Sequence, residues 1–101
     1  MKNFKQLRIW QKGFDIAVNS FKLTATFPNE QKFGIGSQIT RAAVSIPSNI
    51  AEGSSRSSEK DYNRFLEISL GSTYELETQL LISQAAGLGN NNSSNKILSD
   101  I

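Results

Sequence analysis

The chain has 101 residues, a formal net charge of +2, 38% hydrophobic residues, and neither cysteine nor histidine. This length suits one small domain, residues 1–101, with a single core. The missing residue types exclude disulfides, thiolate zinc sites, cysteine nucleophiles and the most common general base, so few enzyme classes remain.

The first predicted helix spans about residues 5–26. Its apolar residues recur at alternating spacings of three and four, which indicates one helical stripe: Leu7, Trp10, Phe14, Ala17 and Phe21. We expect this stripe to be buried, and its aromatic rings to serve as core rather than as platforms for nucleic-acid bases. Phe27-Pro28 should end the helix, because a residue before proline is pushed out of the helical region.

A loop over residues 29–36 leads to a second predicted helix, about residues 37–52, with Ser37 as its N-cap. One broad apolar face runs through it: Ile35, Ile39, Ala42, Ala43, Ile46 and Ile50. Pro47 falls inside this pattern, and the apolar register continues past it, so we expect a kink rather than an end. Gly53 is the expected C′ residue of this helix.

The third predicted helix, about residues 58–86, starts at Ser58, whose N-cap role is supported by Asp61 in the first turn. Its inner face is traced by Tyr62, Phe65 or Leu66, Ser69, Thr73, Leu76, Leu80 and Ser83. The glycine- and asparagine-rich residues 87–92 break it. A short fourth helix, about residues 94–101 and capped by Ser93 or Ser94, completes an all-α bundle of three full helices and one truncated helix.

Polar residues interrupt the apolar faces of the second and third helices: Arg41, Asn49, Glu52, Ser72, Glu75 and Gln79. We interpret them as a buried polar seam in which Arg41 pairs with Glu75, and Asn49 satisfies a carbonyl freed near Pro47. Glu52 and Glu75 could instead act as acid and base or as metal ligands. Because di-metal bundles also use histidine, which this chain lacks, we predict neither a metal nor a cofactor.

Charge divides the chain into a basic part and an acidic part. Residues 1–41 hold seven basic and two acidic side chains (+5), whereas residues 42–101 hold four and seven (−3). Four of the basic residues gather near the N-terminus: Lys2, Lys5, Arg8 and Lys12. With spacings of three and four, the last three would share a helix face and could contact phosphates. A solvated face, or pairing with an acidic helix of a neighbouring copy, is the plainer interpretation.

Several segments together resemble a known family. They are Leu-Arg-Ile-Trp-Gln-Lys at 7–12, Arg-Ala-Ala-Val-Ser-Ile-Pro-Ser-Asn-Ile-Ala-Glu-Gly at 41–53, and residues 65–72 with 75–80. The chain is similar to the small bacterial four-helix-bundle proteins of intervening sequences in 23S ribosomal RNA genes (S23-like proteins), relatives of the accessory protein of diversity-generating retroelements. The resemblance implies an up-down antiparallel bundle, a homopentamer and association with nucleic acid. The short fourth helix departs from it and should leave an open groove.

We therefore predict a non-enzymatic assembly protein, a homo-oligomer that binds RNA or DNA through the basic face of its first helix. The alternative is a structural or protein-partner module whose missing fourth helix is supplied by another chain. We predict no small-molecule substrate. The apolar runs are too short to cross a membrane, and the N-terminus lacks the apolar segment of a secretory signal, so a cytoplasmic location is expected.

Overall fold

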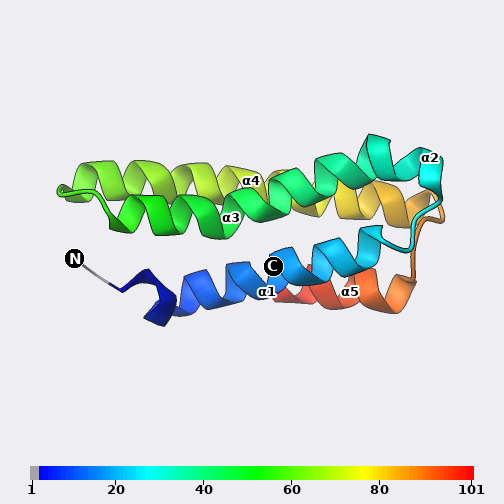
Figure 1. The fold of residues 1–101 in the computed structure, drawn as a ribbon, viewed down its shortest axis with the longest axis horizontal. Helices are drawn as coiled ribbons and strands as arrows, with labels where there is room; N and C mark the ends of the chain where they lie inside the picture. Colours follow the sequence, from blue (N-terminus) through cyan, green and yellow to red (C-terminus); the bar gives the residue numbers. More distant parts are fainter. Residues whose placement is uncertain (1–2) are drawn as a thin grey trace.

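A computed structural model describes residues 3–101, and all regular structure in that range is helical (Figure 1). In chain order the elements are η1 (Phe4–Gln6), α1 (Arg8–Thr24), α2 (Asn29–Gln31), η2 (Lys32–Gly36), α3 (Ser37–Ser54), α4 (Glu59–Ala85) and α5 (Asn91–Asp100). They form an elongated body of 44 × 20 × 19 Å. The all-α prediction is confirmed for the described part of the chain.

The central element is α3, which packs against both α1 and α4, while the shorter α5 packs against α1 and α4. Figure 1 shows α3 and α4 forming one layer of the bundle and α1 with α5 forming the other. Because α5 has 10 residues and α4 has 27, α5 fills the fourth position over only part of the bundle. A fourth helix is present as predicted, and it begins at Asn91 rather than at about residue 94.

The core lies between these helices. Its buried apolar members are Ile16, Ala17, Leu23, Phe27, Ile39, Ala42, Ala43, Ile46, Ile50, Leu76, Leu80 and Ile97. The apolar face predicted for the second helix is therefore correct, with Ile35 at its partly buried edge. On α4 the predicted inner face is also correct, since Ser69, Leu76, Leu80 and Ser83 are buried.

The buried side of α1 differs from the prediction. Phe14 and Phe21 are 48% and 53% exposed, and the buried residues are Gly13, Ile16, Ala17, Ser20, Leu23 and Thr24. A methyl group built on Gly13 would lie 3.1 Å from Ile46 Cγ2 and 3.4 Å from the Pro47 nitrogen. The two helices approach so closely here that the large rings remain on the outer flank of α1.

A second close approach brings the end of α3 against the start of α4. A Cβ atom on Gly53 would lie 2.8 Å from Phe65 Cβ and 3.1 Å from Tyr62 Cδ1. Gly53 lies inside α3 with negative φ, so its predicted role as a C′ residue is wrong. The residue is needed there for its size, because no side chain fits between the two backbones.

The helix boundaries show where local signals hold. Ser58 caps α4 as predicted, its Oγ accepting from the Asp61 N–H at 3.2 Å. Ser37 is not a cap, because Gly36 before it is already helical (φ −59°, ψ −44°) and the expected loop consists of α2 and η2.

Asn90, rather than Ser93 or Ser94, caps α5 by accepting from the Asn92 and Ser93 N–H groups. As predicted, Pro47 does not end α3.

Candidate functional site

The predicted basic face is divided between two elements. Lys5 belongs to η1, whereas Arg8 is the first residue of α1 and Lys12 follows one turn later. Leu7 separates them with extended backbone (φ −72°, ψ 127°), so the continuous helix expected from about residue 5 is not found. Lys2 lies outside the described residues.

The basic side chains of this region are available to a partner. Lys5, Arg8 and Lys12 are exposed. Among residues 3–101, salt bridges join only Arg56 to Glu52 and Lys96 to Asp100. Arg8 and Lys12 border a shallow hollow of about 380 Å³ that also contains Asp15, so one acidic group partly offsets their charge.

The seam between α3 and α4 is not ionic. Arg41 and Glu75 are exposed and form no salt bridge within the described chain, so the expectation of a buried pair is wrong. Both border an open hollow of about 470 Å³, together with Ser72 and the half-buried Gln79. Exposed ion pairs gain little in water, so a pair at this position would add little to the stability of the helix contact.

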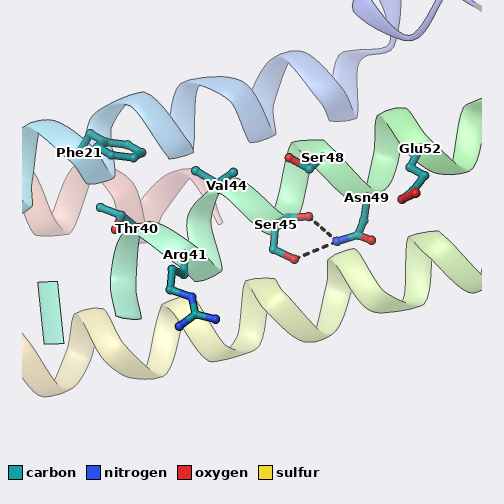
Figure 2. Close-up of a pocket in the computed structure, with 8 residues that line it drawn as sticks. All are labelled: Phe21, Thr40, Arg41, Val44, Ser45, Ser48, Asn49 and Glu52. Atoms are coloured by element: carbon teal, nitrogen blue, oxygen red, sulfur yellow. Dashed lines mark hydrogen bonds between the residues drawn. The ribbon is translucent and has the colours of Figure 1, made fainter. Parts of the chain in front are cut away.

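Hydroxyl groups join the two helices instead. Ser45 Oγ lies 2.8 Å from Ser72 Oγ, and Ser69 Oγ donates to the Ile46 carbonyl at 3.0 Å. The Asn49 amide donates to both Oγ and the carbonyl oxygen of Ser45, each at 2.8 Å (Figure 2). Asn49 therefore braces Ser45 rather than the Ala43 carbonyl that Pro47 deprives of its usual donor. The spacing of four residues between Ser45 and Asn49 is the sequence feature that indicates this contact, because residues one helical turn apart lie on the same face.

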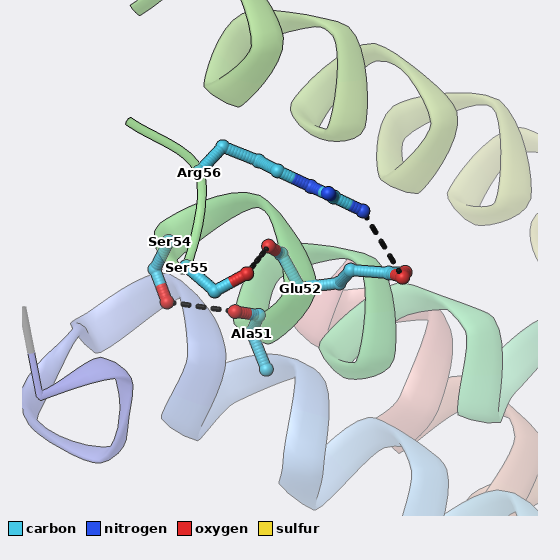
Figure 3. A network of polar contacts seen from close by, with 5 residues as sticks. All are labelled: Ala51, Glu52, Ser54, Ser55 and Arg56. Atoms are coloured by element: carbon cyan, nitrogen blue, oxygen red, sulfur yellow. Dashed lines mark hydrogen bonds and ion pairs between the residues drawn. The ribbon is translucent and has the colours of Figure 1, made fainter. Parts of the chain in front are cut away.

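Glu52 belongs to a separate network at the end of α3 (Figure 3). Its carboxylate lies 3.5 Å from the Arg56 guanidinium, and its carbonyl accepts from Ser55 Oγ at 2.6 Å. The Arg56 guanidinium also lies over the Phe65 ring, 4.8 Å from its centre. Glu52 thus closes the α3–α4 turn and does not join Ser72 and Glu75, so its assignment to the seam is wrong.

An apolar surface was missed because two of its residues, Phe14 and Phe21, were expected in the core. We call Phe14, Val18 and Phe21 of α1 with Val44 of α3 the apolar stripe; all four are exposed. Figure 2 shows Phe21 of α1 and Val44 of α3 bordering the same hollow, which has a volume of about 510 Å³. Trp10 extends the stripe, since the centre of its ring lies 5.3 Å from the centre of the Phe14 ring.

Two further kinds of site, a metal site and a membrane-spanning helix, are not found in residues 3–101. No group of three or more acidic side chains is placed to hold a metal ion in that range. None of its helices combines the length and apolar character needed to cross a membrane.

Comparisons with known proteins assign the family. The family model of 23S rRNA-intervening sequence proteins matches residues 5–101. The chain belongs to this family. A search of curated proteins gives no significant match. Among solved structures, a protein of unknown function from the S23 ribosomal protein family of Bacteroides thetaiotaomicron is similar, with 29% identity and a TM-score of 0.83. That match covers 91% of this chain and 86% of the other.

The resemblance inferred from sequence segments is thus confirmed, and the structure shows what the middle segment does in this family member. Residues 41–53 supply Ser45 and Asn49 to the hydroxyl contacts, Pro47 to the contact with Gly13, and Gly53 to the contact with α4. The segment positions α3 between its two neighbours. Its residues thus contribute hydrogen bonds and close packing to both helix contacts.

Proposed function

We propose that this family member is a non-enzymatic assembly protein that self-associates through the apolar stripe and binds RNA or DNA through basic residues near the start of α1. The observation that carries this proposal is the position of both groups outside the core, with Phe14 and Phe21 about half exposed and Arg8 and Lys12 without salt bridges in the described chain. Exposed apolar patches of this kind mark interaction surfaces.

The family name motivates RNA as the first nucleic acid to test, and the resemblance motivates a ring of five up-down bundles in the cytoplasm. Repetition of the basic groups around such a ring would let several weak phosphate contacts act together. The Lys5, Arg8 and Lys12 side chains of neighbouring copies would then form one extended cationic surface. No step of this proposal requires a catalytic group.

The nucleic-acid part is tested by titrating a labelled single-stranded RNA at several salt concentrations. Replacing both Arg8 and Lys12 by Gln should weaken binding and reduce the slope of log K against log salt by about 1.4, because each phosphate contact contributes about 0.7. Lys22→Gln with Lys32→Gln removes two exposed lysines elsewhere and serves as the matched control. An equal loss of RNA affinity in both double variants would contradict the assignment of RNA binding to Arg8 and Lys12. So would an RNA affinity that does not change with salt concentration.

The assembly part is tested by light scattering at several protein concentrations. Phe14→Ser with Phe21→Ser should convert the assembly to monomers, because it removes the largest rings of the apolar stripe. Phe33→Ser is the control, since Phe33 is 90% exposed and lies outside the stripe. Circular dichroism should show unchanged helix content, and a particle mass unaltered by the double substitution would exclude this surface as the interface.

A further inference from the structure

A second exposed apolar surface lies on α4, on the side of that helix next to α3. Ile68 and Ile82 are 44% and 54% exposed, and the exposed Glu75 lies between them at spacings of seven residues. Residues seven apart share one helix face, so these three side chains, which we call the α4 row, extend over about 21 Å. Glu75 borders the same hollow as Arg41, which places the row on the α3 side of α4.

The α4 row is separate from the other exposed apolar side chains of this helix. Leu70, Tyr74 and Leu81 follow one another at spacings of four and seven, so they share a different face. Ile68 and Leu70 point about 160° apart around the helix axis, because each residue turns the helix by about 100°. The two faces of α4 can therefore be altered independently.

The apolar stripe and the α4 row lie in regions of opposite charge. Between Phe65 and Ala85, α4 carries three acidic side chains and no basic one: Glu67, Glu75 and Glu77. By contrast, α1, which supplies most of the stripe, carries three basic side chains and one acidic one: Arg8, Lys12 and Lys22 with Asp15. The surroundings of the row are therefore negative and those of the stripe are positive.

Arg41 adds a positive charge next to the stripe itself. It borders the hollow that Phe21 and Val44 also border, and it forms no salt bridge within residues 3–101. The acid beside that hollow, Glu52, lies 3.5 Å from Arg56. A surface that covers the stripe and brings a free carboxylate would thus match it in both apolar character and charge.

A contact between two identical stripes would lack this match. In such a two-fold contact the same patch lies on both sides, so positive surroundings would meet positive surroundings. The α4 row supplies the missing combination, because it has apolar side chains at both ends and the carboxylate of Glu75 between them. Both complementary surfaces belong to one chain, which favours a second copy over a different protein as the occupant.

We propose that copies of this chain associate head to tail, with the apolar stripe of one copy covering the α4 row of the next. This inference rests on the self-association proposed above and adds the surface that receives the stripe. Arg41 of one copy then lies near Glu75 of the next at the edge of the contact, where such a pair guides orientation and adds little affinity. Contacts of this kind close into a ring when the rotation between copies allows it.

The first test measures particle mass by light scattering with the full chain. Ile68→Ser with Ile82→Ser should convert the assembly to monomers, because it removes the apolar side chains of the α4 row. Tyr74→Ser with Leu81→Ser is the matched control, since it removes two exposed apolar side chains from the other face of α4 and should leave the mass unchanged. Circular dichroism should confirm that both variants fold, because none of the four side chains is buried.

The second test mixes two variants that are each monomeric. The chain with Phe14→Ser and Phe21→Ser retains its α4 row, and the chain with Ile68→Ser and Ile82→Ser retains its stripe. An equimolar mixture should form particles of two chains and none larger, because one stripe and one row remain able to meet. Sedimentation equilibrium up to about 1 mM detects this pair even at low affinity.

The possible failures separate this inference from the proposed function. If the stripe variant is monomeric but the row variant keeps the mass of the unaltered chain, the α4 row is not the counterpart, whereas the role of the stripe in self-association stands. If neither variant lowers the mass, the proposed self-association itself is wrong.

Three further results would overturn the head-to-tail contact. Dimers of the row variant alone would indicate that stripe meets stripe. A mixture that stays monomeric up to about 1 mM would show that the stripe and the row do not bind each other. A loss of mass in the Tyr74 and Leu81 control equal to that in the row variant would place the contact on no particular face of α4.

Discussion

The inner contacts of the bundle and its outer flanks differ in how closely the helices approach. Two glycines lie where a Cβ atom would press on the facing helix, Gly13 of α1 against α3 and Gly53 of α3 against α4, while large side chains such as Ile46 and Leu76 fill the core around them. On the outer flanks lie large apolar side chains such as Phe14, Phe21 and Leu70, each about half exposed. Close helix approach thus requires the smallest residue at these two points, while some large apolar side chains remain exposed on the flanks.

The largest expected difference between the two regions comes from leucines of α4. Leu76 is fully buried, so Leu76→Ala should lower the free energy of unfolding by about 3 kcal/mol, through lost transfer energy and a cavity. Leu81→Ala, at a position 51% exposed, should cost less than about 1 kcal/mol. Urea unfolding followed by circular dichroism measures both, and equal losses would mean that the outer flank is as well packed as the core.

Glycine substitutions in the two regions should have opposite signs. Gly53→Ala should destabilise by about 1–3 kcal/mol, because the new methyl group would overlap Phe65 Cβ. A Cβ on Gly71, also inside a helix, meets nothing within 4 Å, so Gly71→Ala should stabilise by about 0.5–1 kcal/mol through helix propensity. Thermal unfolding measures both, and a stabilising Gly53→Ala would show that α3 and α4 are farther apart than described.

The Ser69 hydroxyl between α3 and α4 should contribute more to the free energy of unfolding than an exposed hydroxyl does. Ser69→Ala removes a buried hydrogen bond to the Ile46 carbonyl and should cost about 1 kcal/mol. Thr78→Ala removes an exposed bond within α4, to the Tyr74 carbonyl, and should change stability by less than about 0.5 kcal/mol. Chemical denaturation compares them; a neutral Ser69→Ala would mean that this bond does not fix the helix pair.

The smallest effect is expected for the charged pair on the outer surface. A double-mutant cycle of Arg41→Ala and Glu75→Ala should give a coupling energy below about 0.5 kcal/mol, because both side chains are exposed. The same cycle for Ser45→Ala and Ser72→Ala should give about 0.5–1 kcal/mol, because these hydroxyls are in direct contact. A larger coupling energy for Arg41 and Glu75 would mean that they form the ion pair predicted from the sequence.

The candidate surfaces were harder to predict than the helices. Spacing placed Arg41 and Glu75 near one another, and they do border one hollow, but it could not show that this hollow faces water. The shorter Ser45, Ser69 and Ser72 form the contact because hydroxyls fit between closely packed backbones. For Lys5, the extended backbone at Leu7 removed the expected helical face, and no periodicity signals such a break.

The sequence by itself determined the four longer helices, the buried faces of α3 and α4, the Ser58 cap and the family, because these depend on local periodicity, local hydrogen bonds and residue identity. Only the tertiary structure decided which side of α1 is buried. Both sides carry apolar residues at helical spacing, and the choice depends on how closely Gly13 and Ala17 let α1 approach α3. That distance is a property of two helices together, so it also decided where the apolar stripe lies.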